Sequence, residues 1–291
     1  MDQIQRFIFD DANVRGEIVQ IDKTLSEVLA AQAYPASIQL LMGEMLVTTS
    51  LLVETLKIKG EVSLQVQGKG DVNYAVITAN HNQELRGIAR WAEDPGEKSF
   101  EDMFPDGIFT ITITPEQGQR YQGIVAIDKP SLRECVEGYF NQSEQLPTRI
   151  EIRMDTQKLR AAALFLQVLP AQAESSATKD NDDFQHLSTL AETITTEELT
   201  SLSFNNVLHR LFHEHEVRLF DAHEVQFKCT CSKEKSAFAL KSIDKAELLS
   251  IIEEQGSIEM NCQYCNAQYI YDAVDVEAIH SGFYNQNSQV Q

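Results

Sequence analysis

Four of the five cysteines in this 291-residue chain lie in two short stretches near its C-terminal end. Cys229 and Cys231 form a C-x-C pair in "FKCTCSKEK", and Cys262 and Cys265 form a C-x2-C pair in "EMNCQYCNAQY". Two such pairs are typical of tetrahedral all-cysteine zinc sites, because the turn within a pair directs both sulfurs to one point. The spacing predicts a site for one zinc ion per chain, and an iron–sulfur cluster is the alternative that four cysteines allow.

The residues leave two roles for such a site open. In the first, the metal is a static staple for a small C-terminal segment, and structural zinc supplies about 10–16 kcal/mol of apparent binding free energy. In the second, the site is a redox switch. The Cα atoms of residues i and i+2 in an extended strand lie roughly 6.5–7 Å apart, at the limit of disulfide geometry. A Cys229–Cys231 bridge would therefore distort the backbone and oppose the metal-bound fold.

Nearby residues bear on the reactivity of these thiols. Lys228, Lys233 and Lys235 are close in sequence and could favour thiolate formation. The fifth cysteine, Cys135 in "SLRECVEGYF", is predicted to be a small apolar residue of a helix. The sequence contains no G-x-S-x-G, Walker A or H-E-x-x-H pattern and no convincing catalytic dyad, so we expect no enzyme.

Charge and composition exclude several classes of protein. The formal net charge is -20, which opposes a general nucleic-acid role. No run approaches the eighteen apolar residues that a membrane span requires, so no membrane association is expected. The start, "MDQIQRFIFDDANVRGE", lacks the basic and apolar regions of a secretory signal, which predicts a cytoplasmic protein. In that reducing compartment, paired cysteines indicate metal ligands or a redox switch.

The elements that must position the cysteines are predicted to form an α+β fold with a large N-terminal domain of mainly antiparallel sheet and helices. "PASIQLLMGEMLVTTSLLVETLK" is apolar nearly all round and predicts a buried central helix. "GEVSLQVQGKG" and "DVNYAVITAN" predict a hairpin. "GIFTITITP", "RYQGIVAID", "TRIEIRMD" and "AAALFLQVLP" predict further strands. "PSLRECVEGYFNQS" predicts a helix with a Ser131–Glu134 capping box.

Three domains follow from these patterns. Residues 1–178 form the N-terminal α+β core. Residues 179–226 form a helical, metastable linker, because "FQHLSTLAETI", "TTEELTSL" and "SFNNVLHRLFHEHE" predict short helices that need tertiary support. The linker begins within the polar stretch "AESSATKDNDDF". Residues 227–291 form a small zinc-binding domain with two helices, followed by a strand, a Cys262–Cys265 knuckle and a returning strand.

The cysteine pairs and several further segments resemble the redox-regulated holdase chaperones of the 33-kilodalton heat-shock (33 kDa chaperonin) family. The segments are "FKCTCS", "CQYC", "VRGE", "RGIAR", "ITITPEQGQRYQGIV", "YFNQSEQLPTR", "LQVLPAQ" and "TEELT". The resemblance extends over nearly the whole chain. Only the four C-terminal cysteines fall on the metal motif of that family, and Cys135 does not.

The resemblance implies a mechanism. Reduced protein would hold zinc through Cys229, Cys231, Cys262 and Cys265 and be inactive. Oxidation would form Cys229–Cys231 and Cys262–Cys265 disulfides, release zinc and unfold the C-terminal domain. The protein would then bind unfolded or misfolded clients without ATP, as a homodimer. We place the client-binding surface on the apolar face of the linker helices, formed by Leu187, Leu190, Leu208, Leu211 and Phe212.

Two other functions compete with this one. A structural zinc ribbon that binds nucleic acid should be basic, but residues 227–291 contain five Lys/Arg and nine Asp/Glu, a net charge of -4. A thiol–disulfide oxidoreductase would place its C-x2-C at the start of a helix in a βαβ unit, whereas the pattern here is strand, turn and strand. Nucleic-acid retention on a filter would favour the first, and turnover of a disulfide substrate the second.

Overall fold

The structure is a computed structural model that describes residues 2–170 and 177–282. The predicted α+β class is confirmed. The chain divides into two compact units, an N-terminal unit of residues Met1–Lys228 and a C-terminal unit of residues Cys229–Gln291. Part of the polar stretch "AESSATKDNDDF", and the end of the predicted third domain, lie outside the described residues.

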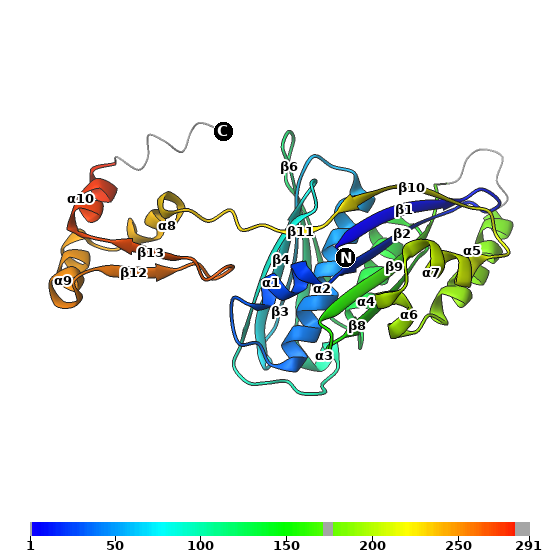
Figure 1. Ribbon diagram of the computed structural model, residues 1–291, viewed down its shortest axis with the longest axis horizontal. Helices are drawn as coiled ribbons and strands as arrows, with labels where there is room; N and C mark the ends of the chain where they lie inside the picture. The colour runs from blue at the N-terminus through cyan, green and yellow to red at the C-terminus, as the bar shows by residue number, and fades with distance from the viewer. Residues whose placement is uncertain (1, 171–176, 283–291) are drawn as a thin grey trace. The chain divides into compact units, whose positions relative to one another are not determined.

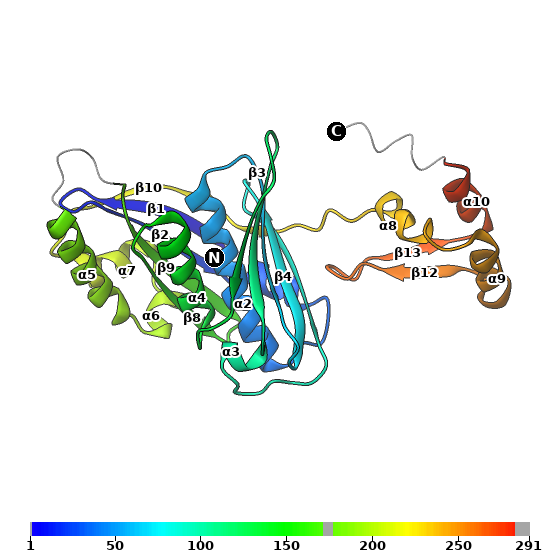
Figure 2. The ribbon, with the colours of Figure 1, turned by 180° about the vertical axis from the view of Figure 1, so that it is seen from behind.

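Two sheets form the described part of the N-terminal unit, and their strand pairs are antiparallel except for the parallel pair of β11 and β5 (Figures 1 and 2). The five-stranded sheet has the order β10-β1-β2-β9-β8. Its strands are β1 (Gln3–Phe9), β2 (Val14–Ile21), β8 (Thr148–Asp155), β9 (Arg160–Val168) and β10 (Val217–Glu224). The six-stranded sheet has the order β11-β5-β4-β3-β6-β7. Its strands are β3 (Gly60–Gln67), β4 (Val72–Asn80), β5 (Glu84–Trp91), β6 (Ile108–Pro115), β7 (Tyr121–Ala126) and β11 (Gln226–Phe227).

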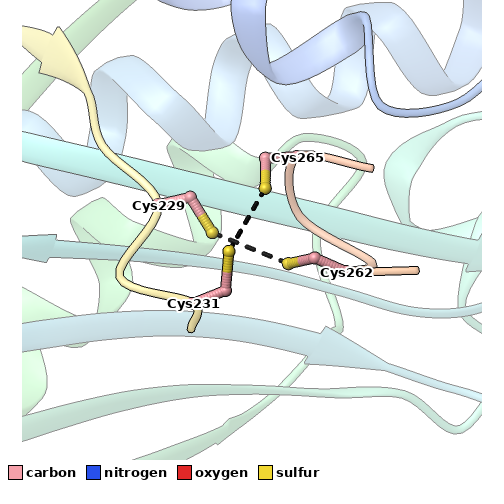
Figure 3. A group of neighbouring side chains, drawn as sticks. All are labelled: Cys229, Cys231, Cys262 and Cys265. Carbon is pink, nitrogen blue, oxygen red and sulfur yellow. Dashed lines mark hydrogen bonds between the residues drawn. The ribbon is translucent and has the colours of Figure 1, made fainter. Parts of the chain in front are cut away.

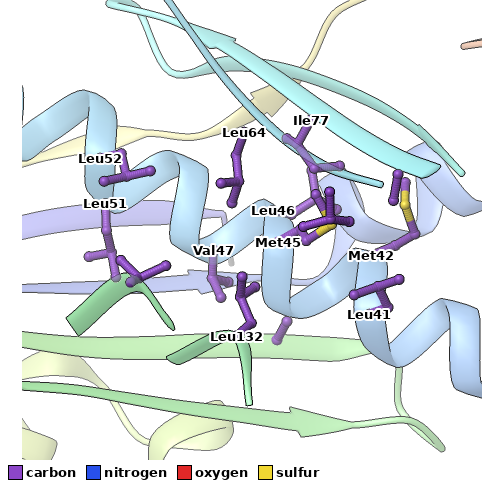
Figure 4. Close-up of a cluster of buried hydrophobic side chains, with 14 of the residues drawn as sticks. Leu41, Met42, Met45, Leu46, Val47, Leu51, Leu52, Leu64, Ile77 and Leu132 are labelled. Carbon is purple, nitrogen blue, oxygen red and sulfur yellow. The ribbon is translucent and has the colours of Figure 1, made fainter. Parts of the chain in front are cut away.

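Helix α2 (Ala36–Leu56) lies between the two sheets and forms the centre of what we call the inner core. Figure 4 shows its apolar side chains around the helix, with Leu64 and Ile77 reaching it from the six-stranded sheet. By length and composition the helix could cross a membrane, but 72% of its most apolar window is buried inside the protein. The predicted buried central helix is confirmed. Pro35 is its N-cap.

The remaining helices of the N-terminal unit are shorter. They are α1 (Lys23–Leu29), α3 (Phe100–Met103), α4 (Leu132–Tyr139), a π-helix η1 (Phe140–Glu144), α5 (Ala177–Glu192), α6 (Thr196–Ser201) and α7 (Phe204–Phe212). At the start of α4, Ser131 accepts a hydrogen bond from the Glu134 amide. The Oε2 atom of Glu134 is buried and has no hydrogen-bond partner, so the structure shows only half of the predicted capping box.

The central strands β2 and β9 of the five-stranded sheet are buried on both faces. Ala163 and Phe165 of β9 face the inner core, while Leu164 and Leu166 face a second cluster, the outer core. Successive side chains of a strand point to opposite faces, so a strand covered on both sides is apolar throughout. This explains the uninterrupted run "AAALFL". Helices α5, α6 and α7 supply the other half of the outer core (Figure 1).

Several elements were not predicted. The sequence analysis assigned no strand to β1, β2 or β5, and the last part of the predicted helical linker is strand β10. Strand β10 pairs with β1, so that Gln3 lies opposite Glu224. Between β1 and β2, Phe7 lies opposite Gly16, and a Cβ at residue 16 would lie 2.1 Å from Phe7 Cζ. The glycine of "VRGE" is therefore needed for this close approach.

The described part of the C-terminal unit, residues 229–282, contains a two-stranded sheet and three helices. Its elements are α8 (Lys233–Leu240), α9 (Lys245–Gln255), β12 (Ile258–Asn261), β13 (Gln268–Tyr271) and α10 (Ala273–Ser281). Helices α8 and α9 and the strand-turn-strand arrangement confirm the prediction, whereas α10 was not predicted. The buried cluster is small and consists of Ala237, Leu240, Leu248, Ile258, Tyr271, Val276 and Ile279.

Candidate metal centre

The structure brings all four predicted ligands together (Figure 3). The sulfurs of Cys229, Cys231, Cys262 and Cys265 lie within 4.8 Å of one another. The Cys229 and Cys262 sulfurs are 3.6 Å apart, and those of Cys231 and Cys265 are 3.4 Å apart. In a regular tetrahedron of sulfurs about 2.3 Å from a zinc ion, neighbouring sulfurs would be about 3.8 Å apart. The four residues therefore fit a single tetrahedral metal ion.

A tight turn between β12 and β13 positions the C-x2-C pair. The Asn266 amide donates to the Cys262 carbonyl at 2.8 Å, and the Cys262 amide donates to the Ala267 carbonyl at 2.8 Å. Asn266 takes a left-handed conformation with φ of 58°, which asparagine tolerates better than most residues. These bonds bend the chain so that both sulfurs face the same side, as the knuckle prediction requires.

The C-x-C pair is held between β11 and helix α8. Ser232 directly follows Cys231 and caps α8, accepting a hydrogen bond from the Lys235 amide at 3.2 Å. The first turn of α8 is fixed to β13, because the Tyr271 hydroxyl donates to the Lys233 carbonyl at 2.7 Å. Tyr271 is fully buried and so links the metal-binding segments to the small core.

Tyr269 is a residue of the site that the sequence analysis did not identify. Its hydroxyl donates a hydrogen bond to the Cys231 sulfur at 3.0 Å. Burial opposes ionisation of Cys231, but the hydrogen bonds to its sulfur from Tyr269 and the neighbouring thiols lower its pKa to about 7. Burial raises the pKa of Cys229, and that of Cys265 is also raised. Tyr269 could have been identified from the sequence, because it lies on the predicted strand that returns from the Cys262–Cys265 turn.

The three lysines near the C-x-C pair each have an oxygen partner. Lys233 Nζ contacts Asp275 at 2.8 Å, Lys235 Nζ donates to the Thr230 carbonyl at 2.7 Å, and Lys228 pairs with Glu84. Each lysine charge is therefore partly offset by its oxygen partner, which weakens the predicted effect of the lysines on thiolate formation. The contacts that favour a Cys231 thiolate are the hydrogen bonds to its sulfur from the Tyr269 hydroxyl and the neighbouring thiols.

Cys135 lies apart from the metal centre, in helix α4. Its side chain is buried in the inner core, and burial raises its pKa to about 11. A thiol in this state is a poor nucleophile and a poor metal ligand. The prediction of a small apolar helix residue is confirmed.

The structure places the five predicted client-binding residues in the outer core. Leu187, Leu208, Leu211 and Phe212 are buried, and Leu190 is half-buried. They face the five-stranded sheet, where Phe212 packs edge-on against Phe9 with ring centroids 5.1 Å apart. These residues are therefore covered in the structure, and they could meet a client only after the helices leave the sheet.

These features define a protein with a two-sheet α+β unit followed by a four-thiolate unit fitted to one metal ion. A family model described as "Hsp33 protein" matches residues 2–272. A 33 kDa chaperonin of Shewanella sp. (strain ANA-3) is 50% identical over 289 residues, which is 99% of each chain. The 33 kDa chaperonin of Shewanella baltica (strain OS155) is 53% identical over 279 residues, or 96% of this chain and 95% of the relative.

A solved structure agrees with this result. The crystal structure of the 33 kDa chaperonin of Thermotoga maritima matches with a TM-score of 0.78, covering 98% of this chain and 100% of that one. The two sequences are 20% identical, so this likeness concerns the fold alone. The chain belongs to the Hsp33 family, and it is a chaperone.

Proposed function

We propose that this chaperone is a redox-regulated, ATP-independent holdase of the cytoplasm that is inactive while its four cysteines hold zinc. The observation that carries the proposal is the convergence of Cys229, Cys231, Cys262 and Cys265 at tetrahedral spacing. Bound zinc would tie the two cysteine pairs together and so contribute to the folding of a unit with a small core. Oxidised, the protein binds unfolded or misfolded clients and prevents their aggregation.

The proposed switch joins Cys229 to Cys231 and Cys262 to Cys265. Each bridge forms from two thiols with loss of two electrons and two protons. One hydrogen peroxide molecule accepts them and becomes two water molecules. Thiolates consumed in this way are no longer ligands, so the site loses its metal. We take a peroxide-class oxidant as the co-reactant, because the thiols are only partly buried.

The choice of bridges decides what oxidation does to the fold. The two shortest sulfur contacts run across the pairs, from Cys229 to Cys262 and from Cys231 to Cys265. Bridges at those contacts would keep the two pairs tied and would replace the metal as a staple. Bridges within the pairs leave no bond between the two segments, and so they destabilise the C-terminal unit. The bridges within the pairs, which the resemblance to the 33 kDa chaperonin family implies, are the ones that would destabilise this unit and so activate the protein.

Oxidation at the metal centre can expose the predicted client-binding residues only if the linker helices change their position. The linker ends where the C-terminal unit begins, and its helices bury the predicted client-binding residues. We propose that unfolding of the C-terminal unit allows these helices to leave the sheet, which would expose Leu187, Leu190, Leu208, Leu211 and Phe212. The oxidised form is proposed to be a homodimer. The net charge of -20 speaks against nucleic acid as a partner.

The direct test follows metal and clients in one experiment. Reduced, zinc-loaded protein is treated with hydrogen peroxide under mild heating. Zinc release is measured with a chromogenic chelator, and suppression of the aggregation of heat-unfolded malate dehydrogenase is measured by light scattering. We expect about one zinc ion released per chain, with protection appearing at the same rate. A Cys135→Ser variant is the matched control and should behave as wild type. Equal protection by the reduced, zinc-loaded form would refute the switch.

The pairing is tested separately by proteolysis and mass spectrometry of the oxidised protein. Peptides joined only within the pairs are expected. Peptides that join Cys229 to Cys262 would contradict the proposed mechanism, because such a bridge retains the tie between the two segments.

A further inference from the structure

The segment directly before the metal centre covers one edge of the six-stranded sheet. Strand β11 pairs with β5 in parallel, with Gln226 opposite Glu84 and Phe227 opposite Leu85. The Gln226 amide donates to the Gln83 carbonyl at 3.0 Å, and the Lys228 amide donates to the Leu85 carbonyl at 2.9 Å. These bonds satisfy backbone groups at an edge that would otherwise be open to another strand.

The side chains of this segment follow the same pattern as a bound strand. Val225 is almost fully buried in the inner core, and Phe227 packs against that core two residues later. The Val225 amide donates to the Asp2 carbonyl at 3.0 Å, and its carbonyl accepts from Thr24 Oγ1 at 3.3 Å. The edge therefore holds an extended segment with two apolar side chains at i and i+2.

Strand β11, which covers this edge, is short and ends just before the metal centre. Strand β11 has two residues, whereas β5 extends over eight residues, Glu84–Trp91. Phe227 is separated from Cys229 by Lys228 alone, whose ammonium group pairs with Glu84. Because a strand alternates, the carbonyls of Gly87 and Ala89 point to the same edge as that of Leu85. Among the strands that the structure describes, β11 is the partner of β5 on this side.

We propose that this edge of β5 is a client-binding site, in which an extended segment of an unfolded polypeptide replaces β11 as a parallel strand. The segment carries apolar side chains at i and i+2, which enter the positions of Val225 and Phe227. The proposal rests on the proposed function and adds one step to it, in which unfolding of the C-terminal unit from Cys229 onward lets the adjoining strand β11 leave the edge. It adds a second surface to the linker helices and states which client segments are preferred.

The binding of a short peptide tests the site without altering the protein. The probe is the labelled hexapeptide HEVQFK, which is the chain's own residues 223–228. The matched control is HEVFQK, which has the same composition but places valine and phenylalanine on opposite faces of a strand. We expect HEVQFK to bind the oxidised protein at least tenfold more tightly than HEVFQK, and to bind the reduced, zinc-loaded protein at least tenfold more weakly than the oxidised form.

Client occupancy is measured by hydrogen exchange. On oxidation, exchange in a peptide that covers residues 82–90 should become faster. Addition of reduced and carboxymethylated α-lactalbumin, a permanently unfolded client without free thiols, should slow it again by several-fold, and excess HEVQFK should release the client. Unchanged exchange at residues 82–90 in a sample that protects malate dehydrogenase would overturn this site and leave the proposed function intact. If the oxidised protein did not protect malate dehydrogenase from aggregation at all, that result would instead overturn the proposed function.

Discussion

Gln20 offers a test of how the linker helices are held on the five-stranded sheet. It lies on β2, and its side chain is 6% exposed. Its Nε2 group donates to two carbonyls at the end of α6, that of Leu199 at 2.7 Å and that of Leu202 at 2.8 Å. One side-chain amide thus satisfies two of the carbonyls that a helix leaves without a partner at its C-terminal end.

The effect of Gln20→Ala can be worked out from these contacts. A neutral hydrogen bond contributes about 0.5–1.5 kcal/mol net, and a buried acceptor left without a partner costs about 1–3 kcal/mol. A small cavity lined by Gln20, Thr200 and Ser201 lies at this end of α6, so we expect water to reach the two carbonyls in the variant. We therefore expect a loss of about 2 kcal/mol in the free energy that holds α6 on the sheet. This corresponds to opening that is about 30-fold more frequent.

Hydrogen exchange of the reduced, zinc-loaded protein measures this opening. A peptide that covers residues 196–203 should exchange about 30-fold faster in Gln20→Ala than in wild type. Peptides from the six-stranded sheet should be unchanged. Gln67→Ala, at an exposed position of β3, is the matched control. Wild-type exchange at residues 196–203 in the Gln20→Ala variant would refute the reasoning, because the two hydrogen bonds would then not hold α6. Under the proposed switch, the same variant should gain client protection faster on oxidation.

Three further outcomes are expected. Cys262→Ser should abolish stoichiometric zinc binding and unfold the C-terminal unit, seen as fast hydrogen exchange there, while Cys135→Ser does neither; retained zinc would contradict the assigned ligands. Burial raises the pKa of Glu17 from its ordinary 4.5 to about 8, so its contribution to stability is present below pH 4.5 and is lost as the pH rises through about 8. Glu17→Gln should therefore make the melting temperature less dependent on pH over that range, and an unchanged pH profile would argue against a buried neutral carboxyl. Glu151 is 1% exposed and contacts three arginines, so Glu151→Gln should lower the free energy of unfolding in urea by about 3 kcal/mol. The more exposed Glu61→Gln should change it by less than about 1 kcal/mol, and equal losses would count against a special role for the buried carboxylate.

Local sequence patterns were sufficient to predict an element wherever its hydrophobic period lies within one continuous segment. The hairpin of β3 and β4, the alternation of β6 and the apolar helix α2 were all predictable, because each carries its period within one segment. The two cysteine pairs were predictable for the same reason, since each pair lies within one short segment of the sequence. The pairing of β10 with β1 was not, because these two strands lie at opposite ends of the N-terminal unit in the sequence. The register of such a pair depends on contacts that no sequence window contains.

The four residues that can bind a metal are identifiable from residue type and spacing, because these limit the coordination chemistry before any packing occurs. The segments that are apolar enough to be buried are identifiable in the same way. The folded structure was needed to show that the five-stranded sheet covers the apolar face of the linker, and that β11 covers the edge of β5. It also decided which sulfurs are neighbours across the two pairs. Those outcomes depend on long-range packing, where many segments compete for the same apolar surface and the final choice is made by all of them together.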